Sequence, residues 1–220
     1  MVLVCIAGLA AVLINLHPWP AAEFGVRFWI YLALGLVGGA LKVRIPGLLG
    51  TFSLTFFVFL MAVADVGWLE ASIVLIASQT VQTIWFAIDG IFLKRILFNA
   101  AAVMIPLTLS YAVDDRIHAG GPHVNPLLRI LAAGAIYFIS NTAIVGGINA
   151  LESSRPYFAV LMSWWRWCLA YYLIGVGLAL LVELINLYFG WGIGFLLTPL
   201  LFQEHIFFKA NADARRPASP

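Results

Sequence analysis

The feature that most constrains this sequence is a series of apolar runs, several of which approach the roughly 20 residues that a helix needs to cross a bilayer. The segments between these runs hold most of the charged residues. Because backbone amides in hydrocarbon must find partners within the protein, such runs favour helices over open strands. We therefore predict an all-α fold, a polytopic transmembrane helical bundle of about eight helices. The expected spans are 1–16, 27–43, 52–67, 69–88, 94–113, 126–151, 158–188 and 190–208.

The composition supports a membrane protein and excludes other classes. The chain is 63% hydrophobic and only 10% charged, whereas soluble domains carry about 25% charged residues. A soluble core of this size could not bury so many large apolar side chains, because a compact small protein leaves much of its surface exposed. The net charge of +2 is dispersed along the chain. Nucleic acid is therefore excluded as a partner, since binding it requires a basic patch.

The domain organisation is predicted to be simple. Residues 1–208 are expected to form a single integral membrane domain, and residues 1–16 are expected to be a retained first span, because they lack the basic region and cleavage site of a signal peptide. Residues 209–220 are small, polar and Pro-bearing, which predicts a disordered cytoplasmic tail.

The distribution of cations predicts the orientation. Lys and Arg are retained in cytoplasmic loops during insertion, and short loops carry this signal best. With eight spans and the N-terminus inside, only Arg27, Arg116 and Arg129 fall in outer loops. Both termini are therefore expected to be cytoplasmic. The remaining cations fall on the inner side: Lys42, Arg44, Lys94, Arg95, Arg155, Arg166, Lys209, Arg215 and Arg216.

Polar residues inside the expected spans are the candidate ligand-binding residues, because polar groups in a membrane are costly. The pairs Gln79 with Gln82 and Glu183 with Asn186 are each three residues apart, so the members of a pair share a helix face. Asn141 lies near the middle of its span. Two interpretations remain open. These groups either form interhelical hydrogen bonds, or line a polar cavity, open to the outside, that receives a small molecule.

No catalytic residue, cofactor or metal ligand is predicted. Cys5 and Cys168 lie in apolar runs without metal-ligand spacing, which indicates packing thiols. His118 and His123 share a loop with two aspartates, for which a solvated loop is the preferred interpretation over a weak metal site. An intramembrane enzyme lacks any supporting motif.

Tryptophans fall mostly near the expected span ends, where amphipathic rings favour the headgroup region, so an interfacial belt is predicted. The cluster of Trp164, Trp165 and Trp167 is dense enough that an aromatic cage for a cation is the alternative.

One stretch carries a family resemblance. Residues 42–59, KVRIPGLLGTFSLTFFVF, resemble the K-V-x-(L/I)-P-G-x-x-G-T-x-S-(L/V)-x-F signature of the multi-span sensory region found ahead of diguanylate cyclase and HD-type phosphohydrolase domains, notably in acidobacterial signalling proteins. Similar pieces follow in the same order: ASQTVQTIWF at 77–86, KRILFNAAAVMI at 94–105, IYFISNTAIV at 136–145 and YYLIGVGLALLV at 171–182. The resemblance implies a ligand-sensing bundle in a bacterial inner membrane, whose cytoplasmic C-terminus drives an output domain.

The basic turn, the glycine-threonine link and the helix that begins with serine are also similar, at the level of fold, to substrate-binding membrane subunits of vitamin uptake systems. The sequence therefore suggests two alternative functions. The first is a membrane sensory or ligand-binding module without catalytic activity of its own, coupled to a cytoplasmic signalling partner. The alternative is a small-molecule transporter or its membrane substrate-binding subunit. In both cases the other partners are the lipid bilayer and an unidentified small molecule.

Overall fold

The computed structural model describes residues 2–15, 24–44, 51–85, 93–118 and 125–214. Within these residues the chain forms eight α-helices, one two-stranded antiparallel sheet and one short 3₁₀ helix, so the all-α prediction is confirmed except for a small hairpin. The elements are α1 (Val2–Asn15), α2 (Val26–Ala40), β1 (Lys42–Arg44), β2 (Thr51–Ser53), α3 (Thr55–Asp65), α4 (Trp68–Ile84), α5 (Leu93–His118), α6 (Pro126–Ser153), α7 (Tyr157–Phe189), η1 (Ile193–Leu197) and α8 (Thr198–Ala214).

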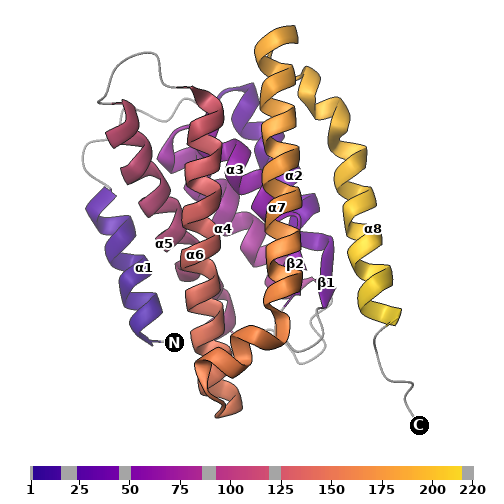
Figure 1. Ribbon diagram of the computed structural model, residues 1–220. Helices are drawn as coiled ribbons and strands as arrows, with labels where there is room; N and C mark the ends of the chain where they lie inside the picture. The colour runs from indigo at the N-terminus through magenta and orange to yellow at the C-terminus, as the bar shows by residue number, and fades with distance from the viewer. Residues whose placement is uncertain (1, 16–23, 45–50, 86–92, 119–124, 215–220) are drawn as a thin grey trace.

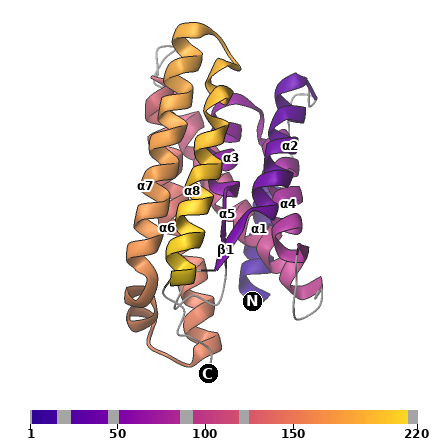
Figure 2. The same ribbon diagram turned by 90° about the vertical axis from the view of Figure 1, so that its right-hand side faces the viewer.

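The helices lie side by side in one bundle and run alternately up and down (Figure 1). Helix α1 begins and α8 ends at the same end of the bundle, near the β1–β2 hairpin; we call this the hairpin end (Figures 1 and 2). Helix α7 ends and α8 begins at the opposite end, which we call the η1 end.

Helix α3 occupies the centre of the bundle. Every residue from Thr55 to Val63 is buried, and α3 packs against α2, α4, α6 and α7. A helix that is apolar on all sides is either buried in a protein core or lies in a membrane, and the sequence TFFVFLMAVAD has this character. Helix α1 packs against α5 at one edge of the bundle, and α8 lies at the other edge against β1 and η1.

The β1–β2 hairpin replaces two expected helix ends. In the antiparallel ladder Lys42 lies opposite Ser53 and Arg44 opposite Thr51. The spans predicted at 27–43 and 52–67 are therefore wrong at these ends, because α2 stops at Ala40 and α3 starts at Thr55. A proline at position 46 opposes helix in the residue before it, and β-branched residues next to the turn favour strand. Helix α8 packs against β1 and covers that side of the hairpin.

The last helix also differs from the expected span 190–208, because α8 begins at Thr198 and ends at Ala214. Pro199 is the second residue of α8 and does not bend it, since the first turn of a helix has no intrahelical partner for the missing N–H. Helix α8 then continues to Ala214, beyond Lys209, where the tail was predicted to begin. The predicted span end at 85–88 lies partly outside the described residues, which stop at Trp85 in that region.

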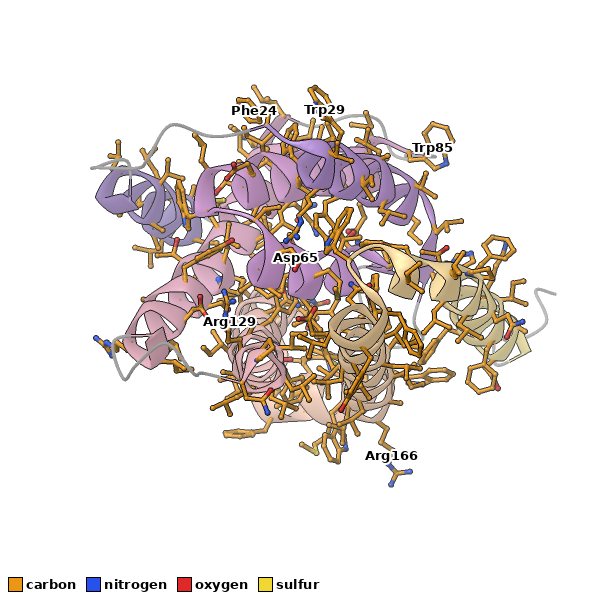
Figure 3. The ribbon with its side chains drawn as sticks, turned by 90° about the horizontal axis from the view of Figure 1, so that it is seen from above. Phe24, Trp29, Asp65, Trp85, Arg129 and Arg166 are labelled. Atoms are coloured by element: carbon orange, nitrogen blue, oxygen red, sulfur yellow. The ribbon has the colours of Figure 1, made fainter. Side chains whose placement is uncertain are left out.

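In the part of the chain that the structure describes, three helices are long and apolar enough to cross a membrane: Leu93–Asp114 within α5, Pro126–Ser153 and Tyr157–Phe189. Phe24, Trp29 and Trp85 point outward from the perimeter when the bundle is viewed along its axis (Figure 3). Large apolar side chains are exposed around the bundle, including Leu173 on α7 at 63%. An extended exposed apolar surface is typical of a protein that meets lipid.

The tryptophans only partly follow the predicted belt. Trp68 and Trp164 are each 1% exposed and belong to the core, so the belt interpretation is wrong for these two. Trp165 is half-exposed and Trp167 contacts the ring of Phe208. The three clustered tryptophans of α7 therefore point in different directions and do not enclose a common space.

Candidate functional site

The five predicted ligand residues are not brought together. Glu183 and Asn186 lie near the η1 end of α7, whereas Gln82 lies beside the hairpin. Asn141 contacts Tyr172 between these two levels. The backbone carbonyl of Gln79 accepts a hydrogen bond from Thr83 on the same helix at 2.7 Å. The predicted cavity lined by all five residues is therefore not formed.

Gln82 belongs to a polar network at the hairpin. The Ser53 hydroxyl donates to Gln82 Oε1 at 2.8 Å and lies 2.5 Å from Thr55 Oγ1. Lys42 Nζ donates to the Gln82 backbone carbonyl at 3.2 Å, and the Tyr171 hydroxyl donates to the Ser53 carbonyl. We call Lys42, Ser53, Thr55, Gln82 and Tyr171 the hairpin network. Its hydrogen bonds tie the hairpin to α4 and α7.

A small pocket adjoins the hairpin network, between the hairpin, α7 and α8. Its polar lining residues Ser53 and Tyr171 are already hydrogen-bonded to each other through the Ser53 carbonyl. The remaining polar residue is His205 of α8. The pocket therefore offers little unsatisfied hydrogen bonding to a ligand. The lining residues are Leu41, Val43, Ser53, Leu54, Tyr171, His205 and Phe208.

Asn141 forms an interhelical bond in the middle of the bundle. Its Nδ2 donates to the Tyr172 hydroxyl at 2.8 Å, which joins α6 to α7. The Tyr172 ring packs edge-on against Phe56 of α3 at 4.5 Å, and Phe56 also contacts Tyr137 at 5.0 Å. This level of the bundle is thus filled by aromatic rings, and Asn141 matches the hydrogen-bonding interpretation.

A second polar group, centred on Asp65, lies at the η1 end. Asp65 is the last residue of α3, and its Oδ2 accepts hydrogen bonds from the Tyr31 hydroxyl and from Trp191 Nε1, the latter at 2.9 Å. Arg27 NH1 lies 3.9 Å from Asp65 Oδ1, and the Arg27 guanidinium lies over the Trp191 ring at 4.9 Å. Figure 3 looks onto this end and shows Asp65 in the middle of the bundle.

A charged pair between α5 and α6 lies at the same end. Arg129 in the first turn of α6 donates from Nε and NH2 to the two carboxylate oxygens of Asp114, at 2.5 and 2.8 Å. Two parallel charge-assisted bonds of this kind are strong and geometrically specific. Arg129 is therefore held in a two-bond ion pair by Asp114, which is itself buried.

Glu183 is the carboxylate without such a partner. It is 8% exposed, and Asp65, Arg129 and Arg27 act on it electrostatically. Both arginines, however, are already paired with aspartates. Among the described residues, no side chain forms a hydrogen bond or ion pair with Glu183. It is the surplus negative charge among Arg27, Asp65, Arg129, Asp114 and Glu183.

Only one of the two polar atoms of the Asn186 side-chain amide is hydrogen-bonded to a residue that the structure describes. Its Oδ1 accepts hydrogen bonds from the backbone N–H groups of Gly192 at 3.2 Å and Gly194 at 2.9 Å. These two donors fix the orientation of the amide, because a flipped amide would place its NH₂ against them. The Nδ2 atom is buried and has no hydrogen-bond partner within the described part of the chain. Glu183 and Asn186 are neighbours on one face of α7.

We call this group the end cluster, and it combines predicted residues with others that the sequence did not single out. The sequence places Arg27 in an outer loop, Asp65 and Trp191 near the ends of expected spans, and Tyr31 in an apolar run. Their positions beside span ends were visible, but their convergence was not. The end cluster consists of Arg27, Tyr31, Asp65, Glu183, Asn186 and Trp191.

No protein-family model, curated protein or solved structure matches this chain. Within the described residues, no group of three or more His, Cys, Asp or Glu side chains is placed to hold a metal ion. Function is therefore inferred from the contacts of the end cluster.

Proposed function

We propose that this protein is an integral membrane sensory or ligand-binding module without catalytic activity of its own, and that the end cluster binds its small molecule. The observation that carries the proposal is the pair formed by Glu183 and Asn186 on one face of α7. Glu183 is 8% exposed and Asn186 Nδ2 is buried, and neither has a hydrogen-bond partner among the described residues. Most buried polar groups in proteins are hydrogen-bonded, and an unsatisfied one costs about 1–3 kcal/mol. A ligand that satisfies both groups recovers this cost.

The position of the end cluster also suggests how binding reaches the other end of the bundle. Asn186 holds Gly192 and Gly194, Trp191 bonds to Asp65, and the Phe195 ring packs against Tyr31 at 5.6 Å. The segment 191–197 thus forms part of the end cluster and leads directly into α8. Helix α8 runs to the hairpin end, where it packs against β1. A ligand that favours one position of this segment would shift α8 between positions.

The proposed location is a bacterial inner membrane, crossed eight times, with both termini in the cytoplasm and a cytoplasmic signalling partner at the hairpin end. Support comes from the common end at which α1 begins and α8 ends. The cations Lys42 and Arg155, in the hairpin and in the turn between α6 and α7, belong to this same end. Cations favour the cytoplasmic side. A membrane-impermeant maleimide added to intact cells should therefore label a cysteine introduced at Asp115 but not one at Lys94.

The transporter alternative is less well supported. Transport requires a path through the bundle, whereas Asn141 is bonded to Tyr172 and the surrounding level is filled by Phe56 and Tyr137. Gln82 is likewise bonded within the hairpin network. The polar groups between the ends are thus used to join helices.

The proposal is tested by retention of small molecules. Purified protein is dialysed against a metabolite extract of the source cells, and retained compounds are identified by mass spectrometry. A compound retained by the wild type and by the matched surface variant Glu152→Leu, but not by Glu183→Leu, supports the end cluster as the site. Retention that is unaffected by Glu183→Leu, or no retention at all, contradicts the proposal. Accumulation of the retained compound inside proteoliposomes would identify a transporter instead.

A further inference from the structure

The charged groups that act on Glu183 and their ion-pair partners do not balance it. Arg27 pairs with Asp65 at 3.9 Å, and Arg129 forms two hydrogen bonds with Asp114. Glu183 remains as a fifth ionisable group without a partner of opposite charge among the described residues. With all five ionised, the group of Arg27, Asp65, Arg129, Asp114 and Glu183 therefore carries one net negative charge. A buried carboxylate that stays charged requires a cation or hydrogen-bond donors, so the missing partner of Glu183 is a donor and, by charge, a monocation.

The second unsatisfied group argues against a bare metal ion. Asn186 Nδ2 is a donor, and its orientation is fixed because Oδ1 is held by Gly192 and Gly194. An N–H₂ group repels a cation and requires an acceptor oxygen. The occupant must therefore present a positive donor to Glu183 and an oxygen to Asn186 at the same time. Since Cβ atoms three residues apart on a helix are about 5–6 Å from each other, the two ligand groups are separated by only a few bonds.

The surroundings suit an organic ammonium group. The face of Trp191 already accommodates the Arg27 guanidinium at 4.9 Å, and Phe195 packs edge-on against both Trp191 and Tyr31. Aromatic rings attract cations and provide apolar contacts for the carbon atoms between the two polar groups.

We propose that the end cluster recognises a small monocation that carries a protonated amine next to a carbonyl oxygen. The amine donates to the Glu183 carboxylate, and the oxygen accepts from Asn186 Nδ2. This inference rests on the proposed function and specifies the ligand class of that site.

The test uses purified full-length protein in detergent and follows thermal unfolding at about pH 6.5, where an α-amine is protonated. The probes are glycinamide, which has both groups, ethylammonium, which has only the amine, and acetamide, which has only the oxygen. Sodium chloride at equal ionic strength is the reference. A ligand that binds the folded state raises the midpoint with concentration. We expect an apparent Kd for glycinamide about tenfold lower than for either single-group probe, because each of them loses one charged or buried hydrogen bond.

Two variants place the response at the site. Glu183→Gln should lose the glycinamide response while unfolding at a temperature no lower than the wild type, because it removes a surplus charge near Asp65. Asn186→Asp keeps an oxygen for Gly192 and Gly194 but removes the donor, and it should also lose the response. The matched surface variant Glu152→Gln should respond as the wild type does.

Several outcomes overturn the inference. Equal responses to glycinamide and ethylammonium would show a site for cations alone, and a response retained in Glu183→Gln would place the amine elsewhere. If no probe shifts the unfolding midpoint, the proposed ligand class is wrong. A bound water that satisfied both Glu183 and Asn186 Nδ2 would give this result. A failure of all three probes does not contradict the proposed function if the dialysis experiment still shows a retained compound whose binding depends on Glu183.

Discussion

The two ends of the bundle carry polar networks that differ in how fully they are satisfied. In the hairpin network, the Ser53 hydroxyl, the Gln82 side-chain oxygen and the Tyr171 hydroxyl all have partners. In the end cluster, Glu183 and Asn186 Nδ2 have none among the described residues. A satisfied buried network rigidifies a fold, whereas an incomplete one is costly to keep. The comparison supports a structural role for the hairpin end, and it is the basis on which we propose binding at the η1 end.

The two networks also differ in charge. The hairpin network has one ionised side chain, Lys42, whose Nζ bonds to the Gln82 carbonyl in the last turn of α4, where a cation is favoured by the helix dipole. The end cluster holds charges of both signs around Asp65. Substitutions in the two networks should therefore differ in size and in their effect on ligand response.

The largest effect is expected from Asp65→Ala. This change removes the common acceptor of the Tyr31 hydroxyl and Trp191 Nε1 and leaves Arg27 without its carboxylate. Leaving the buried Tyr31 hydroxyl and the Trp191 N–H without an acceptor is costly, at about 1–3 kcal/mol per group, so the free energy of unfolding should fall by about 3 kcal/mol. Denaturant unfolding in detergent measures the change. If the free energy of unfolding fell no further than in the exposed control Glu152→Ala, the contacts of Asp65 would not stabilise the η1 end, and the contrast between the two ends would be wrong.

An intermediate effect is expected from Gly194→Ala, which tests whether α8 depends on the end cluster. A Cβ at position 194 would lie 2.6 Å from the Val182 carbonyl oxygen and 2.8 Å from Asn186 Oδ1, so η1 must move away from α7. Overpacking of this kind costs about 1–3 kcal/mol, and amide hydrogen exchange in α8 should become faster.

The matched control is Gly177→Ala, because a Cβ at position 177 meets no atom within 4 Å. It should leave exchange in α8 unchanged. Similar exchange in the two variants would show that η1 does not determine the position of α8.

The smallest effect is expected from Ser53→Ala in the hairpin network. The change removes the hydroxyl contacts to Gln82 and Thr55 but keeps the Ser53 carbonyl that accepts from Tyr171. The free energy of unfolding should fall by about 1 kcal/mol, the net value of a typical hydrogen bond. The glycinamide response should persist, and its loss would mean that the two ends are not functionally separate.

Long apolar helices could be predicted well from the sequence. The span expected at 158–188 is α7, Tyr157–Phe189, and the span at 126–151 is α6, Pro126–Ser153. Length and composition suffice in such segments, because the membrane or the core accepts every side chain. The hairpin could not be predicted in this way, because its two strands of three residues each are stabilised by α8, which is far away in the sequence.

The end cluster could be predicted only in part. A carboxylate and an amide three residues apart in an apolar helix identify Glu183 and Asn186 without a structure. Asp65 could not be assigned, because its partners Tyr31 and Trp191 are 34 and 126 residues away and the contacts depend on the packing of α2, α3 and η1. Residues at helix ends resemble ordinary loop charges until the bundle brings them together.

The shortness of α3 has a consequence for how the chain enters the bilayer. Its 11 residues span about 16 Å, roughly half of the hydrocarbon thickness. Four of the five described helices that pack against it, α4, α5, α6 and α7, are synthesised after it. During translation α3 therefore has no stable place until much of the chain has emerged. Reporter fusions truncated after Asp65 would report the fate of an unfinished assembly, so the compartment of each loop has to be mapped by insertions into the whole chain.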